Sequence, residues 1–141
     1  MATCLIVEDS EVIRTILRRV LEEMGHVVSE ASGPAGALDF CRDHAPDVIF
    51  LDWDLPGLGA LDILRSLGGV SSAPRPKIIL CATENDPKQI ALAKAAGAQH
   101  HILKPFDHNS VLAILRKAGI VGQIDKVSDT VSYDASGSAA G

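Results

Sequence analysis

Four acidic residues and one lysine stand at the ends of short apolar runs, where they can act together on a charged group. Glu8 and Asp9 follow the first run. Asp52 ends another run, with Asp54 two residues later, and Lys104 follows a third. Two carboxylates about 4 Å apart repel each other by roughly 4 kcal/mol at an effective dielectric constant of 20. If these runs are neighbouring strands, the acids therefore need a cation beside them.

A hard divalent cation with oxygen ligands, such as Mg²⁺, meets this need. With Mg²⁺ and the ammonium of Lys104 present, Asp52 can attack a phosphorus atom, because both cations offset the charge that the reacting oxygens share. The residues alone thus indicate metal-assisted phosphoryl transfer onto a carboxylate. The alternative is that Glu8, Asp9 and Asp54 only end strands and cap turns, as acidic residues often do. The joint pattern with a lysine at another strand end favours the phosphoryl site.

Five apolar runs alternate with segments of helical period, the order typical of a parallel sheet with crossover helices. The predicted strands are residues 3–7, 26–30, 47–52, 77–81 and 100–103. The predicted helices are residues 11–24, 34–44, 59–67, 87–96 and 108–118, with a loop of Gly, Ser and Pro at 68–76. Helix caps are expected at Ser10, Asp86 and Asp107, and helix ends at Gly25 and Gly97. Ligands of open parallel sheets bind at the carboxyl ends of the strands, where the acids and the lysine stand.

The chain has 141 residues, the size of one compact domain, and its 47% apolar and 22% charged residues exclude wholesale disorder. We predict a domain at 1–119 and a flexible tail at 120–141, which is rich in Ser, Ala, Gly and Asp. The apolar runs are far shorter than a membrane span, and no signal-peptide pattern begins the chain. We therefore expect a cytoplasmic protein without membrane insertion.

The net charge of −5 argues against sequence-independent binding of nucleic acid, which needs clustered Lys and Arg. Three arginines, Arg14, Arg18 and Arg19, do lie together on one predicted helix. Their pattern is typical of a solvated helix face. We expect no nucleic-acid partner.

The cysteines and histidines have no metal-binding spacing. Cys4, Cys41 and Cys81 lie in apolar settings without C-x-x-C spacing, which is typical of buried reduced thiols. The five histidines are scattered, and the adjacent His100 and His101 would point to opposite faces of a strand. A histidine metal site is therefore not expected.

Three motifs resemble those of receiver domains of two-component response regulators: LIVEDS at 5–10, VIFLDWDLPG at 48–57 and ILKPFD at 102–107. The resemblance covers residues 3–119 and is greatest to the stand-alone, CheY-like kind used in chemotaxis signalling. It implies an α/β, doubly wound, flavodoxin-like fold in which five helices flank a five-stranded parallel sheet of order 2-1-3-4-5.

The resemblance also implies a role for each residue of the acidic group. Asp52 would be the phosphoacceptor, Lys104 would pair with the phosphoryl group, and the peptide before Pro105 would be cis. A Mg²⁺ site would be formed by the side chains of Glu8, Asp9 and Asp52 and by the main-chain carbonyl of Asp54. Glu8 stands where Asp is commoner, which should only lengthen its reach to a metal-bound water.

Two positions depart from the family pattern. Receivers usually have Thr or Ser at the end of the fourth strand, where its hydroxyl bonds a phosphoryl oxygen. Here Ala82 holds that position and Thr83 follows it. We expect either that Thr83 supplies a displaced hydroxyl after a local backbone shift, or that switching depends less on this contact. His101 replaces the usual aromatic residue and is either a group that swings between exposed and buried positions or an ordinary strand residue.

Three further residues are expected near the phosphoryl group. Asp54 and Glu84 hold variable positions that tune its hydrolysis in the family. Trp53, the only tryptophan, adjoins Asp52, so its fluorescence should report metal binding and phosphorylation while its ring covers the pocket edge.

Two uses of such a receiver are predicted. In the first, a histidine kinase or a histidine phosphotransfer protein phosphorylates Asp52, and the face of helix 4, strand 5 and helix 5 changes its affinity for a downstream protein. In the second, the chain is a phosphate sink or shuttle without its own target, which Ala82 would tolerate. Neither use makes it an enzyme acting on an external substrate.

Two enzyme-like alternatives fit the residues less well. DWDLP at 52–56 matches the nucleophile motif of haloacid-dehalogenase-type phosphatases, but the acidic pair precedes it instead of following it. A dinucleotide-binding domain is excluded because no GxGxxG follows the first strand.

Overall fold

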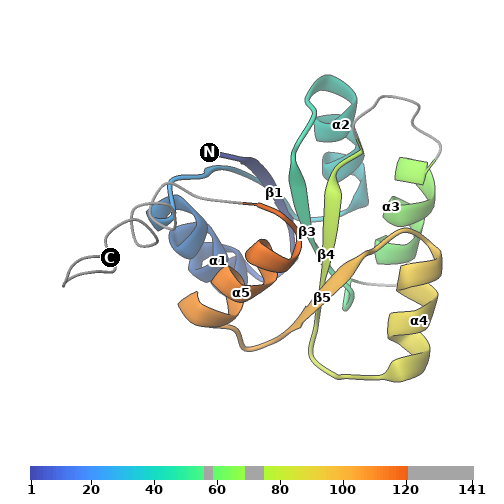
Figure 1. Ribbon diagram of the computed structural model, residues 1–141. Coiled ribbons are helices and arrows are strands. Elements are labelled where there is room, and N and C mark those ends of the chain that lie inside the picture. The colour runs from blue at the N-terminus through green and yellow to red at the C-terminus, as the bar shows by residue number, and fades with distance from the viewer. Residues whose placement is uncertain (56–58, 69–74, 121–141) are drawn as a thin grey trace.

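The computed structural model describes residues 1–55, 59–68 and 75–120, which form a five-stranded sheet with helices on both faces (Figure 1). All strand pairs are parallel, in the order β2-β1-β3-β4-β5. The strands are β1 (Thr3–Val7), β2 (Val27–Ala31), β3 (Val48–Asp52), β4 (Lys77–Ala82) and β5 (His100–Leu103). The helices are α1 (Glu11–Glu23), α2 (Pro34–Asp43), α3 (Gly59–Gly68), α4 (Pro87–Ala95) and α5 (His108–Lys117). The predicted doubly wound, flavodoxin-like α/β fold is confirmed.

The sheet separates two hydrophobic cores. Helices α1 and α5 cover one face, and α2, α3 and α4 cover the other (Figure 1). In β3, Val48 and Phe50 belong to the first core, whereas Ile49 and Leu51 belong to the second. Because β3 is the central strand, all of its residues are buried, which explains its apolar residues at consecutive positions. This strand carries its last residue, Asp52, into the interior.

The predicted helix caps are present. The side chains of Ser10 and Asp86 accept main-chain N–H bonds at 3.3 and 3.0 Å and begin α1 and α4. Asp107 accepts a bond from the Ser110 N–H at 2.8 Å and donates its own N–H to the Ser110 hydroxyl, a capping box. The two predicted helix-ending glycines have positive φ values of 90° and 120°, at Gly25 and Gly97. These caps fix the turns that follow β1, β4 and β5.

Four strand boundaries differ by one residue from the prediction, at both ends of β2, at the start of β3 and at the end of β4. β2 begins at Val27 and not at His26, because the His26 N–H bonds the Leu21 carbonyl at the end of α1 (3.1 Å). β4 extends to Ala82, whose carbonyl accepts the Lys104 N–H at 2.8 Å. Periodicity cannot place such boundaries, because they depend on hydrogen bonds to other segments.

The cysteines differ in burial. Cys4 and Cys81 are buried, as predicted, whereas Cys41 is only half-buried because it lies on the flank of α2, beside the core. Burial, with a smaller effect of the Asp47 charge, raises the pKa of Cys4 to about 12. Burial also raises the pKa of Cys81. Both buried thiols are therefore protonated near neutral pH and unreactive.

Ile120 is the last described residue of the chain, and it lies against the core. Ile120 packs against the core under α1 and α5, and its N–H bonds the Leu115 carbonyl at 2.9 Å. The rest of the predicted tail, residues 121–141, and most of the predicted loop, residues 69–74, lie outside the described residues. In the described ranges, no helix is long and apolar enough to cross a membrane.

Candidate functional site

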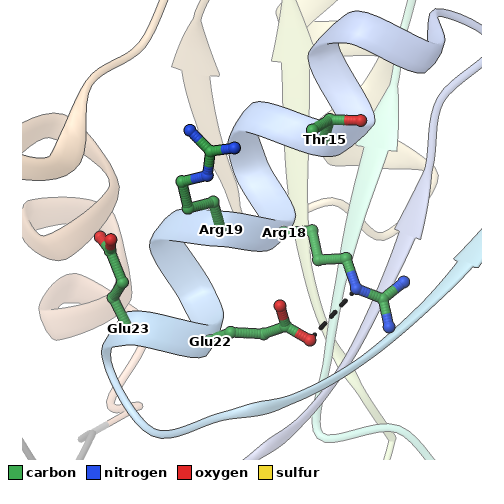
Figure 2. A pocket seen from close by; sticks show the side chains of 5 residues that line it. All are labelled: Thr15, Arg18, Arg19, Glu22 and Glu23. Atoms are coloured by element: carbon green, nitrogen blue, oxygen red, sulfur yellow. Dashed lines mark hydrogen bonds and ion pairs between the residues drawn. The ribbon is translucent and has the colours of Figure 1, made fainter.

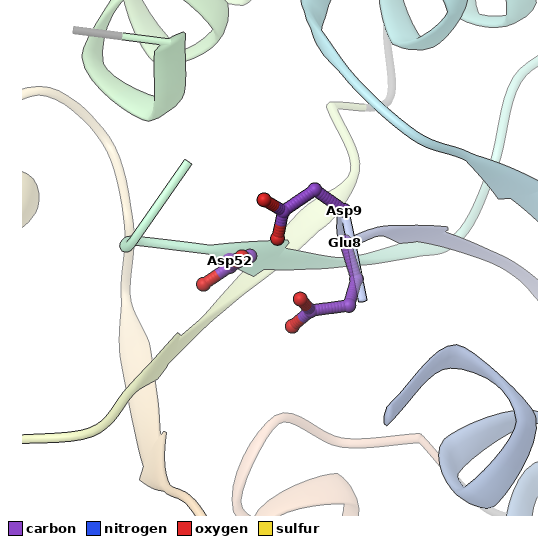
Figure 3. A group of neighbouring side chains, drawn as sticks. All are labelled: Glu8, Asp9 and Asp52. Carbon is purple, nitrogen blue, oxygen red and sulfur yellow. The ribbon is translucent and has the colours of Figure 1, made fainter. Parts of the chain in front are cut away.

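The carboxyl ends of β1, β3 and β5 bring the predicted acids and lysine together. Because β1 pairs with β3, the residues after β1 lie beside the end of β3. Figure 3 shows Glu8 and Asp9, from the end of β1, directed toward Asp52 of β3. One carboxylate oxygen of each lies within 4.8 Å of the others. Lys104, the residue after β5, reaches the same cluster with its ammonium.

Asp52 is held by two donors on one oxygen only. Its Oδ1 accepts the Lys104 ammonium at 2.7 Å and the Asp54 N–H at 2.9 Å. The residue is 1% exposed, and its Oδ2 has no hydrogen-bond partner among the residues that the structure describes. A buried oxygen without a donor is unfavourable unless a ligand completes it. One oxygen of Asp52 is thus fixed, and the other is open to a ligand.

Lys104 is the counter-charge of this cluster. Its Nζ lies 2.9 Å from Glu8 Oε1, 2.7 Å from Asp52 Oδ1 and 3.8 Å from Asp54 Oδ2. Burial disfavours the charged ammonium, but the bonds to Asp52 and Glu8 outweigh this effect and raise the pKa of Lys104 above its usual range. The lysine is therefore a permanent positive charge. Its peptide bond to Pro105 is cis, as the resemblance implied.

Glu8 is the second buried acid. It is 3% exposed, with Oε1 bound to Lys104 and Oε2 accepting the Ser10 N–H at 3.0 Å. Burial raises the pKa of Glu8, the Lys104 and Ser10 bonds lower it, and the proximity of Asp52 raises it further. The net shift of the Glu8 pKa is upward, because burial of the carboxyl is the largest effect and the bonds to Lys104 and Ser10 do not offset it.

The donor set suits a hard divalent cation. The three clustered carboxylates offer only oxygen ligands, and Asp9 is exposed at the solvent side of the group. Asp52 Oδ2, which has no hydrogen-bond partner among the described residues, would offer a cation a buried ligand atom. Mg²⁺ takes a few carboxylates and keeps several of its waters, which an open cluster of this kind allows.

The family can be assigned once this geometry is known. A sequence model described as "Response regulator receiver domain" matches residues 4–116. The chain belongs to this receiver family. It is 36% identical over 118 residues to the transcriptional regulatory protein KdpE of Mycobacterium tuberculosis, a match that covers 84% of this chain and 51% of KdpE. It is 30% identical over 114 residues to the chemotaxis protein CheY of Bacillus subtilis, covering 80% of this chain and 93% of CheY.

A solved structure agrees with the sequence relatives. The chemotaxis response regulator CheY4 of Vibrio cholerae superposes with a TM-score of 0.78 and 28% identity, covering 84% of this chain and 98% of that one. The receiver spans about half the length of several curated relatives that it matches, KdpE included, and most of CheY.

The end of β4 in this receiver lacks a hydroxyl. Ala82, the last residue of β4, is buried and pairs with Leu103 of β5. The exposed Thr83 lies beside the site, where its N–H bonds the Asp54 Oδ2 at 3.3 Å. The main-chain N–H of Thr83 is thus directed at the Asp54 carboxylate.

Thr83 also borders an apolar depression of about 220 Å³ next to Lys104. Its other walls come from α1 and from the turn after β5, namely Ile13, Ile16, Pro105 and Phe106. Ile16 is 46% exposed although it shares the helical period of the buried α1 residues. The acidic group is therefore flanked on this side by an apolar rim.

Trp53 links the site to α4. Its N–H bonds the Cys81 carbonyl at 2.8 Å, and its indole Nε1 donates to Gln89 Oε1 at 2.9 Å. The ring is half-buried against the core under α2, α3 and α4. Sequence reasoning predicted a ring at the pocket edge but missed Gln89, because α4 and Trp53 are far apart in sequence.

The remaining predicted residues lie at the margin of the site. Glu84 is exposed in the turn after β4. His101 of β5 is half-buried and pairs in register with Leu80 of β4. Within the described part of the chain, neither residue has an ion pair or hydrogen bond to the carboxylate cluster, so the tuning role of Glu84 and the two alternatives for His101 stay predictions.

Two arginines of α1, Arg14 and Arg18, pair with acids. Arg18 and Arg19 line a shallow charged depression with Thr15, Glu22 and Glu23 (Figure 2). Arg18 Nε lies 3.1 Å from Glu22 Oε2, and its Nη1 pairs with Glu30. The predicted solvated helix face is confirmed for these residues.

Arg14 is different and was missed as a site residue. It donates to the Glu8 carbonyl at 2.7 Å and to Glu30 Oε1 at 2.9 Å, and its side chain is only 17% exposed. It thus holds the main chain of the acidic doublet from α1. No local pattern in the sequence indicates the contact between Arg14 and Glu30, because Arg14 lies on α1 and Glu30 on β2.

Proposed function

We propose that this receiver accepts a phosphoryl group on Asp52 from a histidine kinase or a histidine phosphotransfer protein, in a Mg²⁺-dependent reaction. The observation that supports it most strongly is the Asp52 carboxylate. It is buried, one oxygen is held by Lys104 and the Asp54 N–H, and the other oxygen has no partner among the described residues.

In the proposed transfer, an Asp52 oxygen forms a bond to phosphorus while the bond between phosphorus and the donor imidazole nitrogen breaks. The imidazole leaves with the electron pair of that bond. The Lys104 ammonium, 2.7 Å from Asp52 Oδ1, stays beside the transferred group and offsets its charge. The Asp54 N–H keeps the carboxylate oriented, so little reorganisation is needed during the reaction.

The cation would be held by Glu8, Asp9 and Asp52, with the main-chain carbonyl of Asp54 as a further ligand. When bound, Mg²⁺ neutralises the acidic cluster and offsets the negative charge of the phosphoryl oxygens. Asp9 is the exposed member of the cluster, so the cation would reach it from solvent.

The phosphorylated receiver would act as a switch. Leu92 of α4 and Leu103 of β5 are 48% and 39% exposed, so the α4, β5 and α5 side offers apolar contacts to a downstream protein. The similarity to CheY of Bacillus subtilis supports a use in chemotaxis as a stand-alone receiver. We expect the protein to be cytoplasmic and to bind neither nucleic acid nor membrane in this role.

A phosphate sink or shuttle is the second candidate. The buried Ala82 cannot offer a hydroxyl to the phosphoryl group, so the link from Asp52 to the α4 side is weaker than in a receiver with Thr there. A partner that binds only the phosphorylated form would favour the switch. In both cases the chain catalyses only its own phosphorylation and dephosphorylation.

The test is a titration of Trp53 emission, first with Mg²⁺ and then with beryllofluoride, a phosphoryl mimic. Wild type should respond to both, because Trp53 follows Asp52 directly. Asp52→Asn should lose the response to beryllofluoride, whereas Asp62→Asn, a change in an exposed acid of α3, should keep it. A wild-type chain that responds to neither ligand would contradict the proposed function.

A further inference from the structure

Asp54 lies beside the acceptor with its carboxylate turned back toward the site. Its Oδ2 accepts the Thr83 N–H at 3.3 Å and lies 3.8 Å from the Lys104 ammonium. That same ammonium bonds Asp52 Oδ1 at 2.7 Å. The Asp54 side chain thus joins the turn after β3 to the turn after β4, across the edge where the acceptor lies.

Lys104 and the Thr83 N–H are the kinds of group that bind a phosphoryl oxygen. An ammonium and a main-chain N–H both stabilise anions. Thr83 follows β4, the strand that pairs with β3 at the register Cys81 to Asp52. Its N–H is therefore at the same edge of the sheet as the acceptor, yet a carboxylate of the chain itself already uses it.

We propose that the Asp54 carboxylate competes with the phosphoryl group on Asp52 for two donors, the Lys104 ammonium and the Thr83 N–H. The Asp54 side chain must therefore rotate away before the phosphoryl group can bind these donors. This inference rests on the proposed function of Asp52. A phosphoryl group adds nearly two negative charges next to Asp54. Its side chain is 42% exposed, so solvent lies beside it and its outward rotation meets little obstruction. Asp54 is in this sense a positioning residue that sets how readily the acceptor pocket takes an anion.

Two variants separate the charge of Asp54 from its hydrogen bond. Asp54→Asn keeps an acceptor oxygen for the Thr83 N–H but removes the charge. Asp54→Ala removes both. Neither change alters the main-chain carbonyl that would bind Mg²⁺. Asp62→Asn is the matched control, because it removes one exposed negative charge on α3 without touching Lys104 or Thr83.

The experiment measures the dissociation constant of beryllofluoride at saturating Mg²⁺, followed by Trp53 emission. We expect Asp54→Ala to bind roughly fivefold tighter than wild type, with Asp54→Asn between the two and Asp62→Asn unchanged. The amide resonance of Thr83 gives a second readout that a general stability effect would not move. Without ligand, the Thr83 amide resonance of Asp54→Ala should differ from that of wild type. In wild type, this resonance should also shift when beryllofluoride binds and replaces the Asp54 carboxylate as the acceptor.

The outcomes distinguish this inference from the function beneath it. A wild type that does not bind beryllofluoride contradicts the proposed function. If wild type binds and both Asp54 variants bind equally or more weakly, Asp54 does not compete with the ligand and the inference is wrong. A Thr83 resonance that is the same in wild type and Asp54→Ala also overturns it.

Discussion

Lys104 matters because two buried carboxylates depend on its charge. Glu8 and Asp52 are 3% and 1% exposed, and the Lys104 ammonium contacts both. Removing one partner of a buried ion pair leaves an uncompensated charge in the interior, which costs more than the pair itself contributes. The residue that would stabilise the phosphoryl group is thus also needed for the fold.

Lys104→Met should lower the free energy of unfolding by about 3 kcal/mol in metal-free buffer, because the acids remain buried without a cation. Urea unfolding measures this change. Mg²⁺ should restore part of the loss, since it can take the place of the missing charge. Lys88→Met, a change at an exposed position of α4, should alter stability by less than about 0.5 kcal/mol. Equal stabilities for the two variants would show that Lys104 is not the counter-charge.

His26 makes stability depend on pH. Burial, with the nearby N-terminal ammonium, lowers its pKa, and its Nδ1 accepts the Ala2 N–H at 3.0 Å. The unfolded chain therefore binds a proton more readily than the folded chain. The stabilisation is complete above the ordinary histidine pKa of about 6.5 and is lost as the pH falls below it.

The free energy of unfolding should thus be about 1 kcal/mol lower near pH 5.5 than near pH 7. His26→Asn should remove most of this difference, because its amide oxygen can accept the Ala2 N–H without titrating. His108→Asn changes an exposed histidine and should keep the wild-type pH dependence. An unchanged profile in His26→Asn would exclude His26 as the cause.

Between elements, Trp53 joins the end of β3 to α4. The Trp53–Gln89 hydrogen bond of 2.9 Å connects the residue after the acceptor to the helix that carries the exposed Leu92. Ala82 offers no hydroxyl at the end of β4. The Trp53–Gln89 bond is a direct contact between the residue next to Asp52 and α4.

Gln89→Ala should free the Trp53 indole and lower stability by about 0.5–1 kcal/mol, the usual value of an exposed hydrogen bond. Acrylamide quenching of Trp53 emission should increase in Gln89→Ala. Lys88→Ala, the neighbouring change on the same helix, should leave quenching unchanged. Quenching that does not differ between wild type and Gln89→Ala would mean that the bond is not formed in solution.

The elements themselves were predictable where local chemistry fixes them. Ser10, Asp86 and Asp107 are side chains whose oxygen can cap a helix, and each does so. Val12 shows the limit of periodicity: it shares the apolar spacing of α1 but is 69% exposed, because the helix is apolar over a wider arc than the sheet covers. What an element packs against is not encoded in its own period.

Across the whole molecule, the fold gathers negative charge at one end of the sheet. The chain carries a net charge of −5, and three of its carboxylates lie within one cluster beside a single lysine. Such an arrangement is stable only if a cation offsets the remaining repulsion or if the acids take up protons. Metal binding should therefore be visible as added stability of the entire domain.

At a Mg²⁺ concentration about ten times its dissociation constant, the free energy of unfolding should rise by about 1.4 kcal/mol. Asp9→Asn should abolish most of this rise without harming the metal-free fold, because Asp9 is exposed. NaCl of equal ionic strength controls for screening. If NaCl and Mg²⁺ stabilise the chain equally, the cluster is not a specific divalent site.

The residues of the site could be predicted from the strand ends, but the order of the strands in the sheet could not. The apolar runs place Glu8, Asp52 and Lys104 at carboxyl ends, yet only the resemblance to receivers implied that β1 and β3 are neighbours. The contacts of Arg14 and Gln89 depend on distant segments meeting in space, so no spacing in the sequence reveals them. The residue types at strand ends can be read from the local sequence, whereas the residues that surround the site can be identified only from the folded structure.

Identification of the modified residue tests the central claim most directly. The protein is incubated with Mg²⁺ and acetyl phosphate, and borohydride then reduces any acyl phosphate to an alcohol, which turns a phosphorylated aspartate into homoserine. Peptide mass mapping should find homoserine at position 52 in wild type and no homoserine in Asp52→Asn. Homoserine at another position, or none in the wild-type protein, would contradict Asp52 as the acceptor.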